Sequence, residues 1–344
     1  MLKIKNKINQ IDKDTILSNM SEGVLAIDNN KRLLMINKTG EEYLDIKSNL
    51  IIGQTVDVVI SDKRFLKFID DLLLSKKSLK EEIKIKKNMN RYFMANGTII
   101  ESEKSAFLIV ISDITKLKQL EKIRQEFVAN VSHELKTPIT SIVGFLETLK
   151  QSNIPKAKQK EFLKKALKNS NRLNSIIDDL LWLSKIESME DTEAFDLNNY
   201  KLLDIINSSI DDLQNHSNKE HKIEVDCKSS INIKADEHLI REAFINLLEN
   251  AIKYGDSTKR IKVSAKTDDN VFITFHNYGG YIPDKYNEMI FNRFYRIDKS
   301  RSRRQGGTGL GLAIVKHIIF VHGGEIYVES KKNNGTSFII SLPG

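Results

Sequence analysis

The sequence predicts a multidomain α+β protein, and three successive patterns of apolar residues carry this prediction. Up to residue 113, short runs rich in β-branched and aromatic residues alternate with turns and short helical stretches. Apolar residues then recur every three or four positions as far as Ile186, which is typical of long amphipathic helices. From about Phe195, strand-like and helix-like runs mix again. We therefore predict three domains, at residues 1–115, 116–190 and 191–344.

The composition is that of a folded, globular protein. At 344 residues the chain is too long for one ordinary core, and with 40% hydrophobic and 29% charged residues it is not expected to be disordered. The net charge of +8 comes from scattered lysines, which favours a solvated surface over nucleic-acid binding. A single cysteine, Cys227, cannot form an internal disulfide and points to a reducing compartment.

No segment has the composition of a membrane span. The longest apolar runs, such as Phe107 to Ile111, fall far short of the roughly 20 residues that a spanning helix needs. The first seven residues lack the apolar centre of a signal peptide. We therefore expect a soluble, cytoplasmic chain. The alternative is the cytoplasmic part of a membrane-associated protein whose anchor lies upstream.

The first region should form a small sheet with helices on it. A helix is expected near residues 12–20, another at 41–46 and a third at 63–74, with a turn at Gly53. Strand-like runs of alternating residues lie at 23–28, 32–37, 81–87, 91–101 and 106–113. The order is two strands, helices and three strands.

The middle region should form a helical hairpin. One apolar stripe begins at Leu117 and runs to Leu135, and a second follows Pro155 and ends near Ile186, with Ser152–Pro155 as the connection. One hairpin leaves an apolar seam that a second copy would cover, so we predict a homodimeric four-helix bundle. The polar run 187–193 is the expected linker.

His133 is the strongest candidate for a catalytic residue. It lies in the run FVANVSHELKTP, where Phe127, Val131 and Leu135 share one helical face and His133 lies about 200° from residue 131. An exposed, neutral imidazole can attack a phosphate, and Glu134 beside it can accept the released proton. Thr137 lies on the face of Glu134.

Two later segments have the chemistry of a nucleotide site. Asn246 and Asn250 are one helical turn apart, and their amide oxygens suit Mg²⁺ held between phosphates. Lys253 can meet a phosphate charge, and Tyr254 can pack on a base. The run Gly307-Thr308-Gly309-Leu310-Gly311 precedes a helix, where backbone amides can approach phosphates.

These segments, with Phe291 to Arg296 between them, resemble in this order the sensor histidine kinases of two-component signalling. The likeness covers residues 116–344, and residues 1–115 look like a PAS sensor domain. The resemblance implies a PAS-like antiparallel sheet, a dimeric four-helix bundle, and an α/β sandwich that binds ATP as in gyrases and chaperones.

The resemblance also implies roles for individual residues. ATP, with Mg²⁺ on Asn250, would phosphorylate His133, and the phosphoryl group would pass to an aspartate of a response regulator's receiver domain. Thr137 would position a water for a phosphatase reaction. Arg296 would contact phosphate, and the basic segment 298–305 would form a lid over the phosphates.

The sequence departs from the family where adenine is read. The family has Asp-x-Gly-x-Gly-Ile, whereas this chain has Asn277, Gly279 and Tyr281 at the Asp and Gly positions. A neutral amide makes a weaker hydrogen bond than a carboxylate, so we expect weaker ATP binding than is usual. The alternative is a nucleotide-defective scaffold that binds the regulator without efficient autophosphorylation.

Two other functions fit less well. A DNA-binding regulator is disfavoured because no recognition-helix module or localised basic stripe occurs. No histidine precedes His133 and no cysteine precedes Cys227, so the first region is not expected to bind haem through histidine or form a flavin adduct through cysteine. We expect it to relay a signal rather than to bind a ligand.

Overall fold

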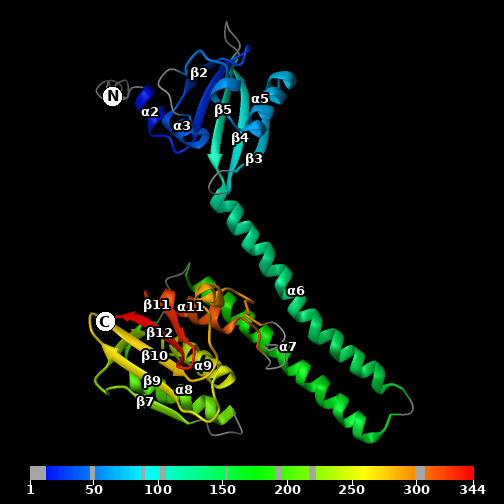
Figure 1. Cartoon of the computed structure of the whole chain (residues 1–344), viewed down its shortest axis with the longest axis vertical. Helices are drawn as coiled ribbons and strands as arrows, with labels where there is room; N and C mark the ends of the chain where they lie inside the picture. Colours follow the sequence, from blue (N-terminus) through cyan, green and yellow to red (C-terminus); the bar gives the residue numbers. More distant parts are fainter. Residues whose placement is uncertain are drawn as a thin grey trace. The chain divides into compact units, whose positions relative to one another are not determined.

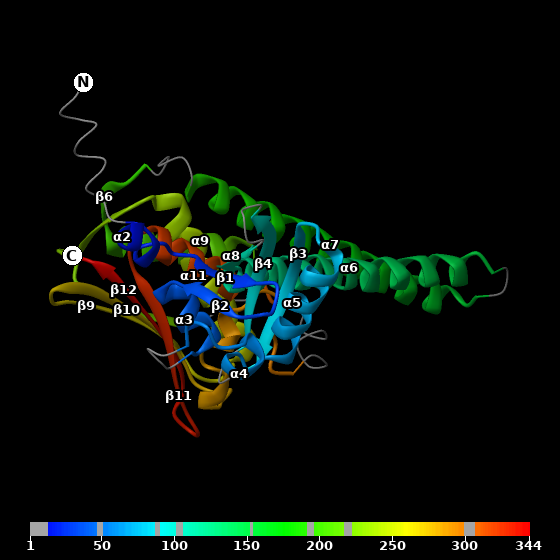
Figure 2. The same ribbon diagram turned by 90° about the horizontal axis from the view of Figure 1, so that it is seen from above.

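The computed structural model describes residues 13–46, 51–86, 90–100, 106–151, 154–190, 196–216, 222–298 and 307–344 (Figures 1 and 2). The chain forms two compact units, Met1–Glu126 and Phe127–Gly344. Each unit has its own cluster of buried hydrophobic side chains.

The first unit contains a five-stranded antiparallel sheet with the strand order β2-β1-β5-β4-β3. The strands are β1 (Gly23–Asp28), β2 (Leu33–Ile36), β3 (Leu79–Lys86), β4 (Asn90–Ile100) and β5 (Ala106–Asp113), and the helices are α2 (Lys13–Ser18), α3 (Lys38–Leu44), α4 (Val56–Val59) and α5 (Lys63–Ser75). All five predicted strands are confirmed to within two residues at each end. The short helix α4 was not predicted, because four residues carry no readable period.

Alternation along the strands explains how this unit buries its core. On β5, Phe107, Ile109 and Ile111 are buried while their neighbours are more exposed. Phe65 and Phe68 of α5 enter the same core from the helical layer.

Asn37 ties three segments of the first unit together. It is the N-cap of α3, so the helix begins at Lys38, three residues earlier than predicted. The buried side chain accepts hydrogen bonds from the amides of Val24 (2.8 Å) and Gly40 (2.9 Å). It donates to the carbonyls of Leu17 (2.9 Å) and Glu22 (2.8 Å), so all four hydrogen bonds of the amide are made.

Helix α6 (Thr115–Leu149) starts where β5 ends, and polar contacts fix that start. The carboxylate of Asp113 accepts a hydrogen bond from the Thr115 amide (2.8 Å) and pairs with Arg91 (3.0 Å). The Thr115 hydroxyl accepts from the amide of Tyr92 on β4 (2.9 Å). The first turn of α6 is therefore fastened to the sheet of the first unit.

The two predicted long helices are confirmed as α6 and α7 (Lys156–Glu190). Helix α7 runs four residues past the predicted end, into the stretch 187–193 that was expected to be a linker, and residues 191–195 lie outside the described residues. So do Ser152 and Asn153 of the predicted connection. Several large apolar side chains on the two helices are exposed in the single chain, among them Ile139, Val143, Leu146, Leu163, Leu167, Ile177 and Leu181.

The rest of the second unit is a sheet covered by helices. The larger sheet has the order β11-β12-β10-β9-β7, with β7 and β9 parallel and the other pairs antiparallel, and β6 and β8 form a small separate sheet. The strands are β6 (Asn198–Lys201), β7 (Ile223–Asp226), β8 (Asn232–Ala235), β9 (Ile261–Thr267), β10 (Asn270–Asn277), β11 (Glu325–Lys331) and β12 (Gly335–Pro343). The helices are α8 (Leu202–His216), α9 (Glu237–Tyr254) and α11 (Gly311–Val321), with the short 3₁₀ helices η1 (Asp284–Tyr286) and η2 (Met289–Phe291).

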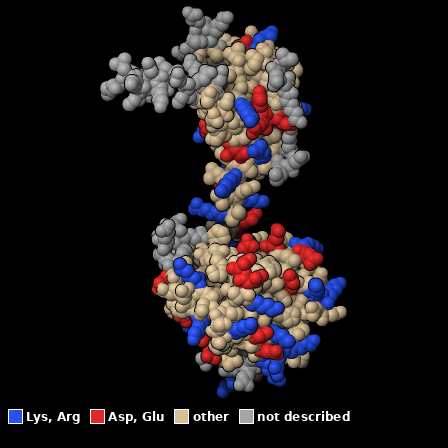
Figure 3. Space-filling view, turned by 90° about the vertical axis from the view of Figure 1, so that its left-hand side faces the viewer, with Lys and Arg blue, Asp and Glu red and all other residues tan. Residues whose placement is uncertain are grey.

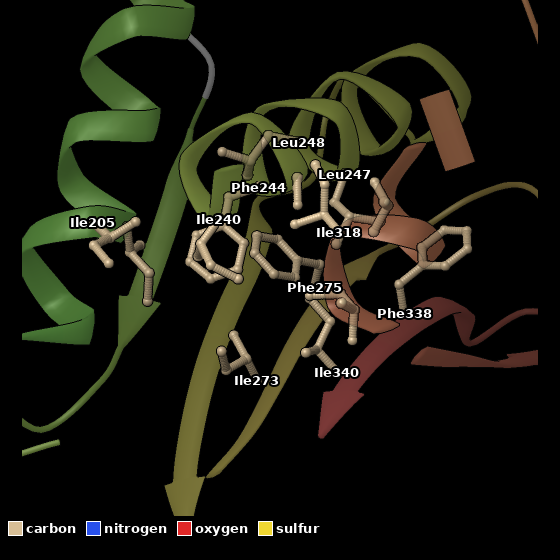
Figure 4. Close-up of a cluster of buried hydrophobic side chains, with 14 of the residues drawn as sticks. Ile205, Ile240, Phe244, Leu247, Leu248, Ile273, Phe275, Ile318, Phe338 and Ile340 are labelled. Atoms are coloured by element: carbon tan, nitrogen blue, oxygen red, sulfur yellow. The ribbon is translucent and has the colours of Figure 1, made fainter. Parts of the chain in front are cut away.

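Figure 4 shows the core between the helices and this sheet. Phe244 of α9 packs on Phe275 of β10, with their ring centroids 5.1 Å apart. Ile318 of α11 and Ile340 of β12 belong to the same fully buried cluster. This packing makes an α/β sandwich and fixes which face of α9 is left to line a site.

The surface carries both signs of charge. On the face drawn in Figure 3, lysine and arginine side chains are interspersed with aspartate and glutamate rather than gathered into one basic patch. Among the described residues, no helix combines the length and the apolar character that crossing a bilayer requires.

The role of Asn37 generates a prediction about stability. Asn37→Ala should lower the free energy of opening of the first unit by roughly 2–4 kcal/mol, because it removes a helix cap and leaves buried backbone groups unpaired. Hydrogen exchange of the β1 and α3 amides in the whole chain measures this quantity.

Asn19→Ala is the matched control. Asn19 is exposed and its side chain donates a hydrogen bond to the carbonyl of Thr15. This substitution should change the free energy of opening at the same amides by no more than about 0.5 kcal/mol. Equal effects of the two substitutions would contradict the role given to Asn37.

Candidate functional site

The structure places His133 on the exposed side of α6. Its side chain is 65% exposed, while Phe127, Val131 and Leu135 are partly buried. The predicted orientation of the histidine is therefore what the structure shows, and the imidazole can be reached by another group without any change in the helix.

Glu134 lies at the centre of a small charge cluster. Its carboxylate is 2.8 Å from a guanidinium nitrogen of Arg172 on α7 and 3.2 Å from one of Arg296. The three side chains are between 6% and 13% exposed. Partly desolvated charges of this kind need partners, and here one carboxylate meets two cations. The carboxylate oxygen nearest to His133 is 4.0 Å from its Nδ1.

Thr137 uses its hydroxyl within the helix. The hydroxyl donates to the carbonyl of His133 (3.0 Å), a back-bond to the preceding turn. The sequence reasoning correctly placed His133, Glu134 and Thr137 on one stretch of helix but missed Arg172, since nothing local to α7 marks it.

A cavity of about 890 Å³ lies in the same unit. It is bounded by α9, by β10 and β12 of the sheet, by the segment after η2, and by α7. Most of the predicted nucleotide-binding residues line it, namely Asn246, Asn250, Lys253, Tyr254, Asn277, Arg296, Gly307, Thr308, Gly309 and Gly311. The fold thus brings together segments that are more than 60 residues apart in the sequence.

Two predicted residues, Gly279 and Leu310, do not line the cavity. Gly279 has φ +125°, and a Cβ there would lie 2.9 Å from the amide of Asp256, so its role is a close approach of two backbone segments. Leu310 is fully buried and anchors the start of α11 in the core. Its apolar side chain was a signal for the core rather than for a ligand.

Asn246 explains why residue 311 is glycine. The Asn246 amide group donates to the backbone carbonyl (3.1 Å) and the carboxylate (3.2 Å) of Glu242. Its oxygen then faces Gly311, where a Cβ would lie only 2.5 Å away. The N-terminus of α11 is therefore packed directly against α9.

The glycine loop meets the segment after η2. Arg296 donates a short hydrogen bond to the carbonyl of Thr308, and the Phe294 amide donates to the carbonyl of Gly309 (2.8 Å). Phe294 has φ +61°, a left-handed conformation that strains a bulky residue. Its ring lies 5.9 Å from that of Phe127 on α6, so the strain occurs at a contact between the segment after η2 and the helix of His133. Residues 299–306, which include most of the predicted lid, lie outside the described residues.

Acidic side chains line the cavity beside α9, and the sequence reasoning missed them. Burial raises the pKa of Asp179, on α7, to about 6, with help from the charges of Glu249 and Asp178, while a hydrogen bond from Thr308 opposes the rise. Burial and the charge of Asp179 also raise the pKa of Glu242. The pKa of Lys253 is lowered, chiefly by burial.

The donors fit a hard divalent cation accompanied by phosphates. Amide oxygens of Asn246 and Asn250 lie on one wall, with carboxylates nearby and Lys253 and Arg296 as cations. Oxygen ligands of this kind suit Mg²⁺, which also takes phosphate oxygens as ligands. The residues therefore fit the group that the sequence implied.

Two family models match the chain. One is "His Kinase A (phospho-acceptor) domain", over residues 123–188, and the other is "Histidine kinase-, DNA gyrase B-, and HSP90-like ATPase", over residues 235–344. His133 and Glu134 fall within the first match, and Asn246, Asn250 and the glycine loop within the second.

Curated relatives include proteins named "Sensor protein kinase WalK" from Staphylococcus aureus. One is 32% identical over 342 residues, which are 96% of this chain and 80% of the relative. Another, from strain JH9, has the same identity and coverage of this chain, which spans 55% of that relative's length.

A solved structure of histidine kinase ThkA, in complex with response regulator protein TrrA, has a similar fold. Its TM-score is 0.52 at 23% identity, and the match covers 96% of this chain and 98% of that chain.

The raised pKa of Asp179 generates a prediction about pH. A folded pKa above the ordinary value of 3.8 means that the stability contributed by the neutral acid is complete below about pH 4 and is lost as the pH rises through 6. Asp179→Asn, which stays neutral, should therefore exceed the native chain in stability by roughly 1–3 kcal/mol at pH 8. This difference in the free energy of unfolding between the variant and the native chain should fall by about half between pH 8 and pH 5. Thermal unfolding of the second unit measures it.

Asp211→Asn is the matched control, because Asp211 is an exposed aspartate on α8. The free energy of unfolding of this variant should stay close to that of the native chain from pH 5 to pH 8. A constant gap for Asp179→Asn across the pH range would contradict the desolvation of Asp179.

Proposed function

Because the chain belongs to the ATP-dependent sensor histidine kinases of two-component signal transduction, we propose that it transfers the γ-phosphate of ATP to His133. The observation that carries this proposal is the pairing, in one unit, of an exposed imidazole with a cavity lined by Asn246, Asn250 and a glycine loop. From His133 the phosphoryl group would pass to an aspartate on a separate receiver domain. The named complex of ThkA with a response regulator supports a partner of this kind.

The transfer step needs three things from this chain's own residues. A nitrogen of the His133 ring attacks the γ-phosphorus while the bond to the ADP oxygen breaks, and the ring proton passes to a base. Glu134 is the neighbouring carboxylate that can take the proton. Lys253 and Arg296 supply positive charge at the phosphates. When bound, Mg²⁺ would neutralise phosphate charge, with Asn250 as a ligand and Asn246 beside it.

The contacts of Glu134 support a closed, inactive state in the structure. While Glu134 is paired with Arg172 and Arg296, the proposed base is neutralised and the proposed phosphate contact is occupied. Activation would separate Arg296 from Glu134. Arg296 could then contact the phosphates, and Glu134 could accept the ring proton. A shift between two such packings is a common mode of switching.

We also propose the domain roles expected from the sequence. Residues 1–115 would be a PAS-like sensor that relays a signal through the start of α6, residues 116–190 a dimerisation and phosphotransfer hairpin, and residues 191–344 the catalytic ATP-binding domain. The exposed apolar side chains on α6 and α7 support a homodimeric four-helix bundle, since a second copy would cover them. We keep the proposal, made from the sequence, of a cytoplasmic protein or the cytoplasmic part of a membrane-associated kinase.

A phosphatase activity toward the regulator is proposed for the same helix. Thr137 would have to turn its hydroxyl away from the carbonyl of His133 in order to position a water. The neutral Asn277 in place of an acid favours a second candidate, a nucleotide-defective scaffold that binds the regulator without efficient autophosphorylation.

Phosphorylation of the purified chain separates these two candidates. With γ-labelled ATP and Mg²⁺, we expect label that is stable in alkali, labile in acid and absent from His133→Gln. The control is His238→Gln, because His238 is exposed on α9 and is not among the residues that line the cavity. Label that survives His133→Gln would refute the assignment of the acceptor, and no label on the native chain would favour the scaffold.

Substitutions of Glu134 and Arg172, which form one ion pair, should change the rate of His133 phosphorylation in opposite directions. Glu134→Gln should lower the initial rate of His133 phosphorylation by roughly 10²- to 10⁴-fold, because the base is lost. Arg172→Gln should raise the rate by roughly 3- to 10-fold, because it weakens the closed state and leaves the base in place. Lys164→Gln, an exposed change on the same helix, should leave the rate unchanged. A rate that falls in a folded Arg172→Gln chain would contradict the inhibitory role of the cluster.

A further inference from the structure

Asn277 is a buried amide that opens into the cavity. It ends β10, where Val271, Ile273 and Phe275 are buried at alternate positions, so its side chain continues the face of the sheet that carries the helices. Only 4% of the residue is exposed, yet it lines the cavity. Within the described part of the chain, its side-chain amide makes no hydrogen bond to another residue.

The backbone on both sides holds Asn277 in place. It lies opposite Thr336 of β12 in the ladder, and a Cβ at Gly335 would lie 2.1 Å from the Asn277 carbonyl. A Cβ at Gly255 would lie 3.4 Å from the Cβ of Asn277. The side chain therefore has a fixed origin and can adjust mainly by rotation of its amide.

The neutral part of the cavity lies around Asn277. Thr336 faces it across the ladder, and Phe338, two residues along the same strand, lies on the same face. Ile282 and Ile290 complete this apolar wall, whereas Lys253, Arg296 and the glycine loop supply the groups suited to phosphates. A purine ring suits the neutral wall, and this assignment rests on the proposed binding of a nucleotide.

The hydroxyl groups near Asn277 in this wall already make hydrogen bonds within the protein. The Thr336 hydroxyl donates to the carbonyl of Gly280 (2.7 Å) and lies 2.7 Å from the Ser330 hydroxyl. Asn277 therefore offers the adjustable polar atoms that read the edge of a base.

The chemistry of an amide differs from that of a carboxylate at this position. A carboxylate only accepts hydrogen bonds, so it accepts from a 6-amino group and repels a 6-oxo group. An amide presents an acceptor in one orientation and a donor after a half-turn, with no change in charge. An amide at this position can therefore bind a purine of either kind without leaving a polar atom unpaired.

We propose that Asn277 makes the nucleotide site tolerant of 6-oxopurine nucleotides, so that ITP and GTP bind and serve as phosphoryl donors beside ATP. ITP carries the 6-oxo group without the 2-amino group of GTP. It therefore isolates the effect of position 6 from any steric exclusion at position 2.

Competition binding with the Mg²⁺ salts of ATP, ITP and GTP tests the proposal on the whole chain. The native chain should bind ATP and ITP within about tenfold of each other, and Asn277→Asp should widen the ratio in favour of ATP by roughly 10- to 100-fold. Asn277→Ala should weaken both nucleotides and keep their ratio near that of the native chain. A native preference for ATP above about 100-fold, or an unchanged ratio in Asn277→Asp, would overturn the proposal.

Phosphorylation of His133 separates this inference from the proposed function. The inference is supported if γ-labelled ITP labels the native chain, and if Asn277→Asp loses this labelling while ATP still labels it. Label from ATP with none from saturating ITP overturns it. If neither nucleotide labels His133 but the binding ratios change as expected, the kinase activity fails and the selectivity of Asn277 stands. If Asn277→Asp does not fold, equal weakening of ATP and ITP by Asn277→Ala supports the inference, and selective loss of one of them overturns it.

Discussion

The carboxylate of Glu134 is held between two guanidinium groups, and the arrangement of the second unit depends on this contact. Arg172 reaches it from α7 and Arg296 from the segment that precedes the glycine loop. Charges this poorly exposed to water are stable only when they are paired, and removing one partner leaves the others at a cost. Arg296 also donates to the Thr308 carbonyl, so the same guanidinium links the helix of His133 to the glycine loop. A group that serves both sites cannot serve them independently.

Charge in the cavity imposes a second constraint. Asp179, Glu242 and Glu249 line it together with Lys253 and Arg296, so the wall near α9 carries acids as well as bases. Phosphates entering this space meet Asp179 and Glu242, whose pKa values are raised by burial and by neighbouring carboxylates. A divalent cation that accompanies the phosphates removes this repulsion, and the amide oxygens of Asn246 and Asn250 can ligate it without adding charge. In this way the neutral amides and the acids of one wall suit a metal-bound nucleotide better than a free one.

Local patterns in the sequence predicted most of the elements of the first unit, the two long helices and many of the cavity residues. The spacing of Asn246, Asn250 and Lys253 predicts that they share one helical face. The glycines of the loop indicate that another group approaches the backbone closely. Asn37 could have been read as the cap that starts α3, since it immediately precedes the first helical residue. Arg172 and Asp179 were missed because their contacts arise from the packing of α7 against α6 and against the elements around the cavity, which no periodicity within α7 encodes. Leu310 and Gly279 were assigned to the ligand because they lie in recognised motifs, whereas one is a core residue and the other serves a tight backbone contact.

Helix α7 connects these observations. Arg172, Ser175 and Asp179 are three and four residues apart, so they lie on one face of the helix, with Arg172 at the carboxylate of Glu134 and the other two at the cavity. A rotation of α7 by the angle of a single residue, about 100°, would withdraw all three side chains together. The acid beside His133 and the loop residue Thr308 are therefore both contacted by the same helical face. A signal that alters the packing of the hairpin needs no separate route to the cavity, because the helix that would pack in the bundle already forms part of the cavity wall.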